Sequence, residues 1–276
     1  MATQNQFPLN ELPIELQREV FILAAYRDRG SAIRLVHVAR RFHHWISPRL
    51  YDIVTLGSSD TDLFLRTVQS RPDADTFFTN HVKRLCLSVS VTPRNAEHIL
   101  SACNGVNDLA FWVDYLTTSP NRSIGPLLSS LPLNRLSVEV RHFGSIFRDP
   151  DIRYTWFDTL THLDIIFWHH ELSPSIPHIE KLSSLTHLAM RLRHNQASEN
   201  SLMAILSAAR KLKILIIYDE SDSAEEAIWA TDSRVVFLPY PFEVVHDWES
   251  QAMDEESCSW KRAEELVRRK ASEQQG

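Results

Sequence analysis

The sequence has little glycine: six residues in 276, and the closest two of them lie 19 positions apart. A P-loop and a dinucleotide-binding fingerprint each need at least two glycines within about six residues. The sequence therefore excludes the two nucleotide-binding loops that are most readily recognised from sequence.

Cysteine is also scarce, with Cys86, Cys103 and Cys258 scattered along the chain. No two of them have the close spacing of a zinc site, and an odd number does not make a disulfide framework. Reduced thiols are therefore expected, as in the cytosol or nucleus. No basic-then-apolar leader and no run of 18 apolar residues occurs, so we expect a cytoplasmic or nuclear protein with no membrane partner.

Motifs for catalysis and metal binding are missing as well. Neither G-x-S-x-G nor H-E-x-x-H is present, and nothing pairs a nucleophile with its base. The repeat described below aligns His162 with His187, but two histidines lack the further ligands of a tetrahedral zinc site. The net charge of −6 argues against a dedicated nucleic-acid binder. The prediction is a protein that is not an enzyme and has no cofactor, metal or nucleic-acid partner.

What the sequence does contain is a repeat. The stretch Leu160–Ile165 returns 25 positions later as Leu185–Met190, with the same Leu-Thr-His-Leu start. A wider frame, with an aliphatic residue three before an anchor and an apolar residue two after it, occurs seven times. Successive anchors are 24, 27, 27, 25, 27 and 23 residues apart; they are Leu85, Leu109, Leu136, Leu163, Leu188, Leu215 and Leu238.

This period resembles that of leucine-rich repeats, whose units of 20–29 residues each hold a strand and a helix or turn. Several stretches between the anchors have helical apolar spacing, for example around Ile99, Leu127 and Ile205. The resemblance implies an α/β fold in which residues 57–245 form a curved leucine-rich-repeat-like solenoid of parallel strands with outer helices. A mixed α/β domain that is not a regular horseshoe is the structural alternative.

Residues 8–56 have helical rather than repeat patterning. One apolar stripe at i, i+4, i+8 and i+11 predicts a helix that Gly30 and Ser31 end; its members are Leu12, Leu16, Val20 and Leu23. A second stripe predicts a helix over about residues 32–45, which Pro48 ends; its members are Leu35, Val38, Phe42 and Trp45. Two helices this short need further support from a domain or a partner.

This segment resembles the divergent F-box domains of fungal proteins. The residues that match are Leu12-Pro13-x-Glu15-Leu16, Val20-Phe21, Leu23, Leu35-x-x-Val38-x-Arg40-Arg41-Phe42-x-x-Trp45 and Pro48-x-Leu50-Tyr51. The resemblance implies docking on the Skp adaptor subunit of a cullin-RING ubiquitin ligase, an SCF complex. The contacts that it implies are Leu12, Pro13, Leu16, Val20, Val38 and Phe42. The alternative is that these residues only pack the helical pair against the first repeat.

Strand side chains alternate in direction, so the residues between the inward anchors are expected on the concave face of the solenoid. Arginine and aromatic residues are frequent hot spots of protein interfaces. A protein substrate is therefore predicted to bind there, through Arg84, Trp112, Arg135, His162, His187, Arg191 and Tyr218. Two alternatives are a merely solvated face and a face covered by the C-terminal tail.

Residues 246–276 are predicted to form a polar C-terminal helix or tail, because Glu264–Arg268 and Glu265–Arg269 are helix-stabilising i, i+4 pairs. Taken together, the patterns favour a substrate-recognition adaptor of a ubiquitin ligase, with an unidentified protein substrate. The alternative is a non-catalytic repeat scaffold for protein-protein interaction with no ligase role. An enzyme is the third and least favoured interpretation.

Overall fold

The computed structural model describes residues 11–27, 29–117, 120–169, 174–193, 198–219, 232–253, 256 and 258–273. The chain divides into two compact units, a helical unit Met1–Ile53 and an α/β unit Val54–Gly276. The boundary lies three residues before the predicted one. The predicted separate tail, 246–276, belongs to the α/β unit.

In its described residues the helical unit has three α-helices, α1 Ile14–Arg27, α2 Arg29–Val36 and α3 Arg40–Leu50. Phe42, Ile46 and Ala32 form its buried centre. The single helix expected over 32–45 is instead divided between α2 and α3. Gly30 and Ser31 lie inside α2, and Pro48 lies inside α3. Pro48 has no amide to donate back along the helix, but the burial of Phe42 and Ile46 just before it stabilises α3 despite this loss.

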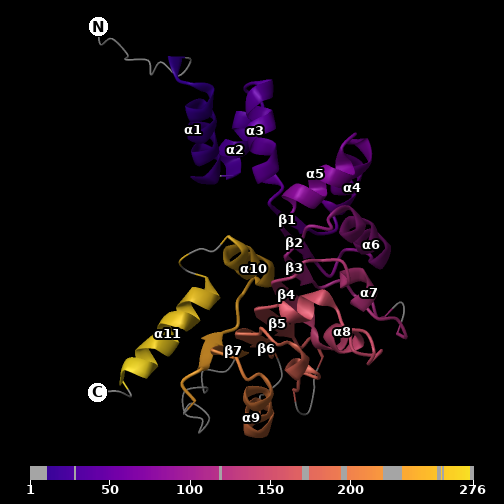
Figure 1. Ribbon diagram of the computed structural model, residues 1–276, viewed down its shortest axis with the longest axis vertical. Helices are drawn as coiled ribbons and strands as arrows, with labels where there is room; N and C mark the ends of the chain where they lie inside the picture. The colour runs from indigo at the N-terminus through magenta and orange to yellow at the C-terminus, as the bar shows by residue number, and fades with distance from the viewer. Residues whose placement is uncertain are drawn as a thin grey trace. The chain divides into compact units, whose positions relative to one another are not determined.

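The α/β unit is built on an eight-stranded parallel sheet whose strands follow the order of the chain (Figure 1). The strands are β1 Ile53–Leu56, β2 Arg84–Leu87, β3 Asp108–Phe111, β4 Arg135–Glu139, β5 His162–Ile166, β6 His187–Arg191, β7 Ile214–Asp219 and β8 Val235–Pro239. The coarse α/β prediction is thereby confirmed. The sheet begins with β1, before residue 57, where the repeat region was expected to start.

Register follows the predicted frame over six strands. The anchors are aligned from Leu85 through Leu109 and on to Leu215. The eighth strand departs from it, because Leu215 pairs with Val235 and Tyr218 pairs with Leu238. Leu238 is therefore not the anchor of β8 but belongs to the opposite face, where it packs in one cluster with Tyr218 and Trp260.

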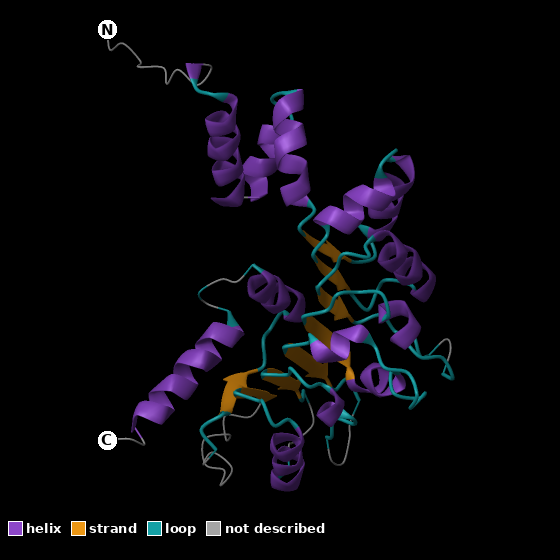
Figure 2. Ribbon diagram, in the orientation of Figure 1, coloured by secondary structure: helices purple, strands orange, loops and turns teal. Residues whose placement is uncertain are grey.

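Helices cover both faces of the sheet. Those that connect successive strands are α4 Thr61–Ser70, α5 Ala74–His81, α6 Pro93–Ala102, α7 Gly125–Leu128, α8 Val140–Ser145 and α9 Glu199–Ala208, with 3₁₀ turns at Thr155–Asp158 and Ile179–Lys181. Figure 2 shows α4 to α8 along one face of the sheet and the last two helices along the other. Those two are α10 Val244–Ala252 and α11 Ser259–Glu273.

Local sequence explains where two of the connecting helices begin. The Thr92 side chain accepts a hydrogen bond from the Asn95 amide at 3.3 Å, and Pro93 follows in the first turn of α6. The Ser198 side chain accepts in the same way from the Ser201 amide at 3.2 Å, at the start of α9. Among the described helices, none is both long and apolar enough to cross a membrane.

Candidate functional site

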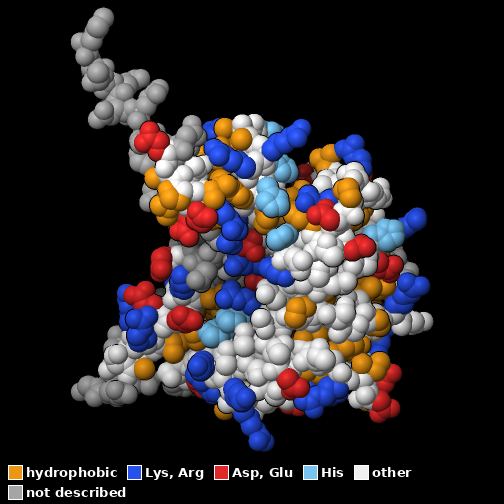
Figure 3. Space-filling model, turned by 45° about the horizontal axis from the view of Figure 1, so that its top comes forward, with side chains coloured by type: hydrophobic (Ala, Val, Ile, Leu, Met, Phe, Trp, Pro, Cys, Tyr) orange, Lys and Arg blue, Asp and Glu red, His pale blue; other side chains and the backbone are white. Residues whose placement is uncertain are grey.

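An apolar stripe lies uncovered on the helical unit. Leu16, Val20 and Leu23 fall on one face of α1 and are 50%, 44% and 63% exposed. Further large apolar side chains exposed on this unit are Ile14, Ile33 and Val38. Figure 3 shows hydrophobic side chains grouped on the surface of these helices. The unit therefore presents apolar surface of the kind that marks an interaction site.

The six residues that the resemblance assigns to adaptor docking lie in different environments. Leu16, Val20, Val38 and Pro13 are exposed, and Leu12 is half-buried. Phe42 is 4% exposed, because its ring packs against Phe21, with ring centroids 3.8 Å apart. Phe42 is therefore a core residue of the helical unit, and any effect on docking would act through the fold.

The face of the sheet that was expected to be open is covered by α10 and α11 (Figure 1). Trp260 and Ala263 of α11 are 5% and 0% exposed, and they pack in one cluster with Ile216, Tyr218 and Leu238. The C-terminal residues were expected to be polar, yet α11 has an apolar side that makes it part of the core. Of the alternatives for this face of the sheet, the structure therefore has the one in which the C-terminal residues cover it.

Arg191 is the centre of the contacts beneath α10. Its guanidinium is fully buried and donates from Nε to the Asp164 carboxylate at 2.8 and 3.1 Å. Its Nη2 donates to Asp247 of α10 at 2.5 Å, and its Cζ lies 4.4 Å from the centre of the Tyr218 ring. Burial opposes the charge of Arg191, but Asp164, Tyr218 and Asp247 raise its pKa well above the usual value. Arg191 thus ties the sheet to the C-terminal helices as a cation.

His162 and His187, neighbours in the sheet, lie beneath α11. Their rings stack with centroids 4.2 Å apart, and the Trp260 ring meets both edge-on at 5.2 and 5.7 Å. Burial, helped by His187 and Arg135, lowers the pKa of His162 to about 3. The predicted alignment of the two histidines is confirmed, and the contacts show them as packing residues under a helix.

Polar contacts join helix α10 to further strands of the sheet. The Thr55 hydroxyl donates to Glu249 at 2.7 Å, and Arg135 donates to the carbonyl of Gln251 at 3.3 Å. Asp108 is hydrogen-bonded to Trp248, and burial raises its pKa to about 6. A cavity of about 20 Å³ remains between the helix and the sheet, close to the space of one water molecule.

These contacts change the interpretation of the predicted substrate-binding residues. Arg191 and Tyr218 are fully buried and Trp112 is 4% exposed, whereas the other four are half-buried; these are Arg84, Arg135, His162 and His187. The structure thus corrects the expectation that all seven line an open surface. Alternation placed them on the right face, but that face is occupied by α10 and α11.

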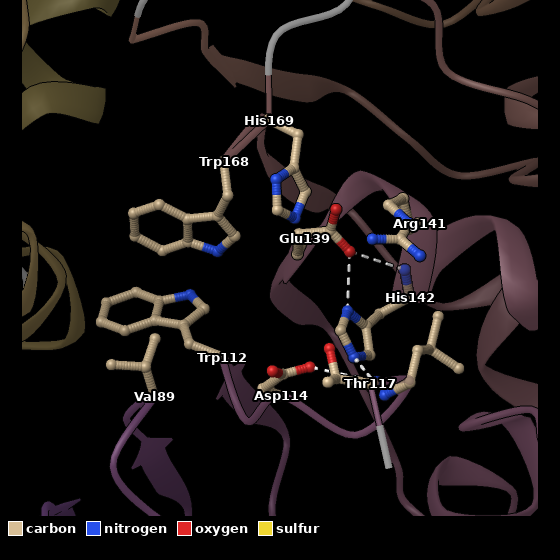
Figure 4. A pocket seen from close by; sticks show the side chains of 10 residues that line it. Val89, Trp112, Asp114, Thr117, Glu139, Arg141, His142, Trp168 and His169 are labelled. Carbon is tan, nitrogen blue, oxygen red and sulfur yellow. Dashed lines mark hydrogen bonds and ion pairs between the residues drawn. The ribbon is translucent and has the colours of Figure 1, made fainter. Parts of the chain in front are cut away.

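One pocket remains open at the carboxyl ends of β3, β4 and β5 (Figure 4). Its volume is about 320 Å³, at the small end of the usual range for ligand sites. Trp112 directly follows β3, Glu139 ends β4, and Trp168 lies two residues after β5. All three occupy alternation positions of the same face of the sheet, which is why their side chains reach one pocket.

Glu139 and His142 form the polar wall of this pocket. One carboxylate oxygen, Oε2, accepts from the His142 amide at 2.9 Å and from His142 Nδ1 at 2.7 Å. His142 Nε2 accepts from the amides of Tyr115 and Leu116 at 3.1 and 3.3 Å. Because amides only donate, the single imidazole proton is on Nδ1 and His142 is neutral. The other oxygen of Glu139, Oε1, is buried with no hydrogen-bond partner in the described part of the chain.

Sequence reasoning placed Trp112 on this face but missed Glu139, His142 and Trp168 as a site. The signal was present in the repeat alignment, which sets Glu139 at the position of Trp112 and Trp168 two residues further along on the same face. The importance of His142 depends on the loop at Tyr115 that folds back over it, and no repeat position encodes that contact.

No group of three or more histidine, cysteine or acidic residues suited to a metal ion occurs among the residues described. No family model matches the chain, and no curated protein matches its sequence.

Proposed function

We propose that this chain is a non-catalytic substrate-recognition adaptor of a cullin-RING ubiquitin ligase. Its helical unit docks on the Skp adaptor subunit, and its α/β unit, a leucine-rich-repeat-like solenoid, holds a protein substrate. The proposal starts from the F-box resemblance of residues 10–52 and from the repeat period of the sheet.

The observation that carries the proposal is the uncovered stripe of Leu16, Val20 and Leu23 above a core closed by Phe42 and Ile46. A helical unit that only capped a repeat domain would have no need of apolar residues on a second, solvent-facing side. An amphipathic helix that lays such a stripe into a groove of another protein is a recurring mode of recognition. Burying one leucine or valine side chain fully is worth about 1.5–3 kcal/mol, so two suffice to decide docking.

The α/β unit supports the second half of the proposal. Parallel strands in chain order place equivalent residues of successive repeats side by side along the sheet. The carboxyl ends of neighbouring strands then bring residues from separate repeats into one pocket. A rigid scaffold with a pocket made by three repeats fits the recognition of a short segment of another protein.

A binding assay between the purified full-length chain and a purified Skp adaptor subunit tests the proposal. The wild-type chain is expected to bind, and Leu16→Ala with Val20→Ala is expected to weaken binding by about tenfold or more. The matched control is Leu63→Ala with Met203→Ala, because these side chains are 53% and 55% exposed on the α/β unit. The control is expected to bind as the wild type does.

Failure of the folded wild-type chain to bind the adaptor subunit would overturn the ligase role and favour a scaffold instead. Equal loss in both double variants would show that exposed apolar surface in general, and not this stripe, is responsible. Phe42→Ala is unsuitable as the docking variant, because it removes the centre of the helical core.

A further inference from the structure

The pocket at the ends of β3, β4 and β5 has one strong chemical preference. Its polar wall offers the buried oxygen Glu139 Oε1, an acceptor without a hydrogen-bond partner within the described residues. A buried acceptor of this kind is costly unless a donor meets it. A ligand group that reaches this oxygen must therefore bring an N–H or an O–H.

The charge at this point is negative. Glu139 is 4% exposed, and its one described ion-pair candidate is His142, which is neutral because its Nε2 accepts two amide hydrogen bonds. Arg141 also lines the pocket and is exposed. Figure 4 shows Arg141 and His142 on one side of Glu139 and the two indoles on the other. A ligand that enters between the indoles thus meets the carboxylate first, and an anion would be repelled there.

The two tryptophans suit a cation. Trp112 is held in place because its Nε1 donates to Ser137 at 2.9 Å, which leaves its ring as an apolar wall with no free donor. Trp168 is half-buried, and the Arg193 guanidinium already lies 5.7 Å from the centre of its ring, although Arg193 does not line the pocket. Indole rings attract ammonium and guanidinium groups, and pockets that recognise alkylated ammonium groups use such walls.

We propose that this pocket binds the ammonium group of a lysine side chain, free or with up to two N-methyl groups, on a protein partner. The ammonium group donates a hydrogen bond to Glu139 Oε1, and its methylene stem lies against Trp112 and Trp168. The assignment of that partner as a substrate rests on the proposed function, whereas binding of the lysine side chain by the pocket does not.

The test uses the purified full-length chain alone, without adaptor or ligase subunits, so its outcome is independent of the docking assay. Short peptides with one central lysine, Nε-trimethyl-lysine, Nε-acetyl-lysine or glutamate are titrated by calorimetry and by tryptophan fluorescence. The lysine peptide is expected to bind, and the trimethyl-lysine peptide, which has no N–H for Glu139 Oε1, is expected to bind more weakly. Acetylation, which removes the charge, and glutamate, which reverses it, are each expected to weaken binding by about tenfold or more.

Two variants connect binding with the pocket. Glu139→Gln is expected to reduce the affinity for the lysine peptide by about tenfold, since it removes the charge and turns a donor toward the ligand. Trp168→Ala is expected to lower it several-fold, and Trp168→Phe to retain most of it. The matched control is Glu199→Gln, an exposed glutamate on α9 of the same unit, which is expected to have no effect. Circular dichroism verifies that each variant is folded.

Equal binding of the acetylated and the free lysine peptide would overturn the proposal, and so would unchanged affinity in folded Trp168→Ala. Tighter binding of the glutamate peptide would assign the pocket to anions through Arg141. Methylamine and tetramethylammonium serve as small probes with and without an N–H. If either binds as tightly as the lysine peptide, the ligand is a small ammonium ion and the assignment to a protein side chain is refuted.

Discussion

Replacing Arg191 with methionine tests whether the buried ion network fixes α10 on the sheet. The variant leaves Asp164, with its side chain 6% exposed, and Asp247, at 14%, near each other with no cation between them. Removing one partner of a buried ion pair typically costs about 3–5 kcal/mol, because the remaining charge is uncompensated. Since a domain of this size is stable by about 5–15 kcal/mol, Arg191→Met is expected to lose a large fraction of its stability.

The double variant Arg191→Met with Asp164→Asn separates this explanation from simple loss of packing. Asparagine keeps the shape of Asp164 and can still accept the hydrogen bond from Ser137, which spans 2.9 Å. One buried carboxylate is then gone, so the double variant is expected to be more stable than the sum of the two single changes by about 2 kcal/mol. Asp164→Asn alone is expected to be destabilising, because Arg191 loses the charged carboxylate that accepts from its Nε.

Urea unfolding at pH 7, followed by tryptophan fluorescence and circular dichroism, gives the free energy of each variant. Arg210→Met is the matched control, because Arg210 is exposed on the same unit, and it is expected to change stability by less than roughly 0.5 kcal/mol. A loss below about 1 kcal/mol for Arg191→Met, or strict additivity in the double variant, would refute the role given to the network.

Further outcomes follow from the same buried face. Folding holds His162 neutral, with its pKa lowered to about 3, so its contribution to the free energy of unfolding is expected to be full above pH 6.5 and to be lost as the pH drops toward 3. Thermal unfolding across that pH range checks this, and His162→Phe should flatten the decline. Trp260→Ala is expected to cost about 3–5 kcal/mol and to make α11 sensitive to limited proteolysis, whereas resistance would show weak docking. Burial raises the pKa of Cys103 to about 12 and that of Cys86 further, so neither thiol should react with an alkylating reagent before unfolding; labelling of the native chain would contradict this.

The sequence predicted the sheet well because a parallel strand buried on both faces still keeps its anchor. Leu109, Leu136 and Leu163 are aligned in register and stand 27 residues apart, so spacing alone fixes which residues are neighbours. In β8 the rule failed, because Val235, Val236 and Leu238 are all buried and apolar. Where both faces of a strand are covered, apolar and polar residues no longer alternate along it. The spacing of apolar residues that defines the repeat then fits more than one register.

The covering of the concave face could not be predicted from charge patterns. The residues of α11 were interpreted through their glutamate–arginine pairs, which describe only the solvent side of a helix. The apolar side is Trp260, Ala263, Leu266 and Val267, at helical spacing, and it packs against β7 and β8. The stripe was visible in the sequence, but the surface that it would meet depends on the curvature and register of the sheet.

Burial also distinguishes between polar residues of the same face that the sequence leaves equivalent. Arg191 and Asp164 pair across adjacent strands, and Arg191 also donates to Asp247 of α10, which leaves only its Nη1 without a partner in the described residues. Glu139 occupies the same face but ends its strand beyond these contacts, and one of its oxygens has no partner in the described residues. A buried polar atom without a partner is rare in a folded protein. Arg191 Nη1 and Tyr218 Oη also have no partner in the described residues, but they do not line the open pocket, whereas Glu139 lines it beside Trp112 and Trp168. A ligand is therefore expected at the strand ends and not along the row of charges that alternation first indicates.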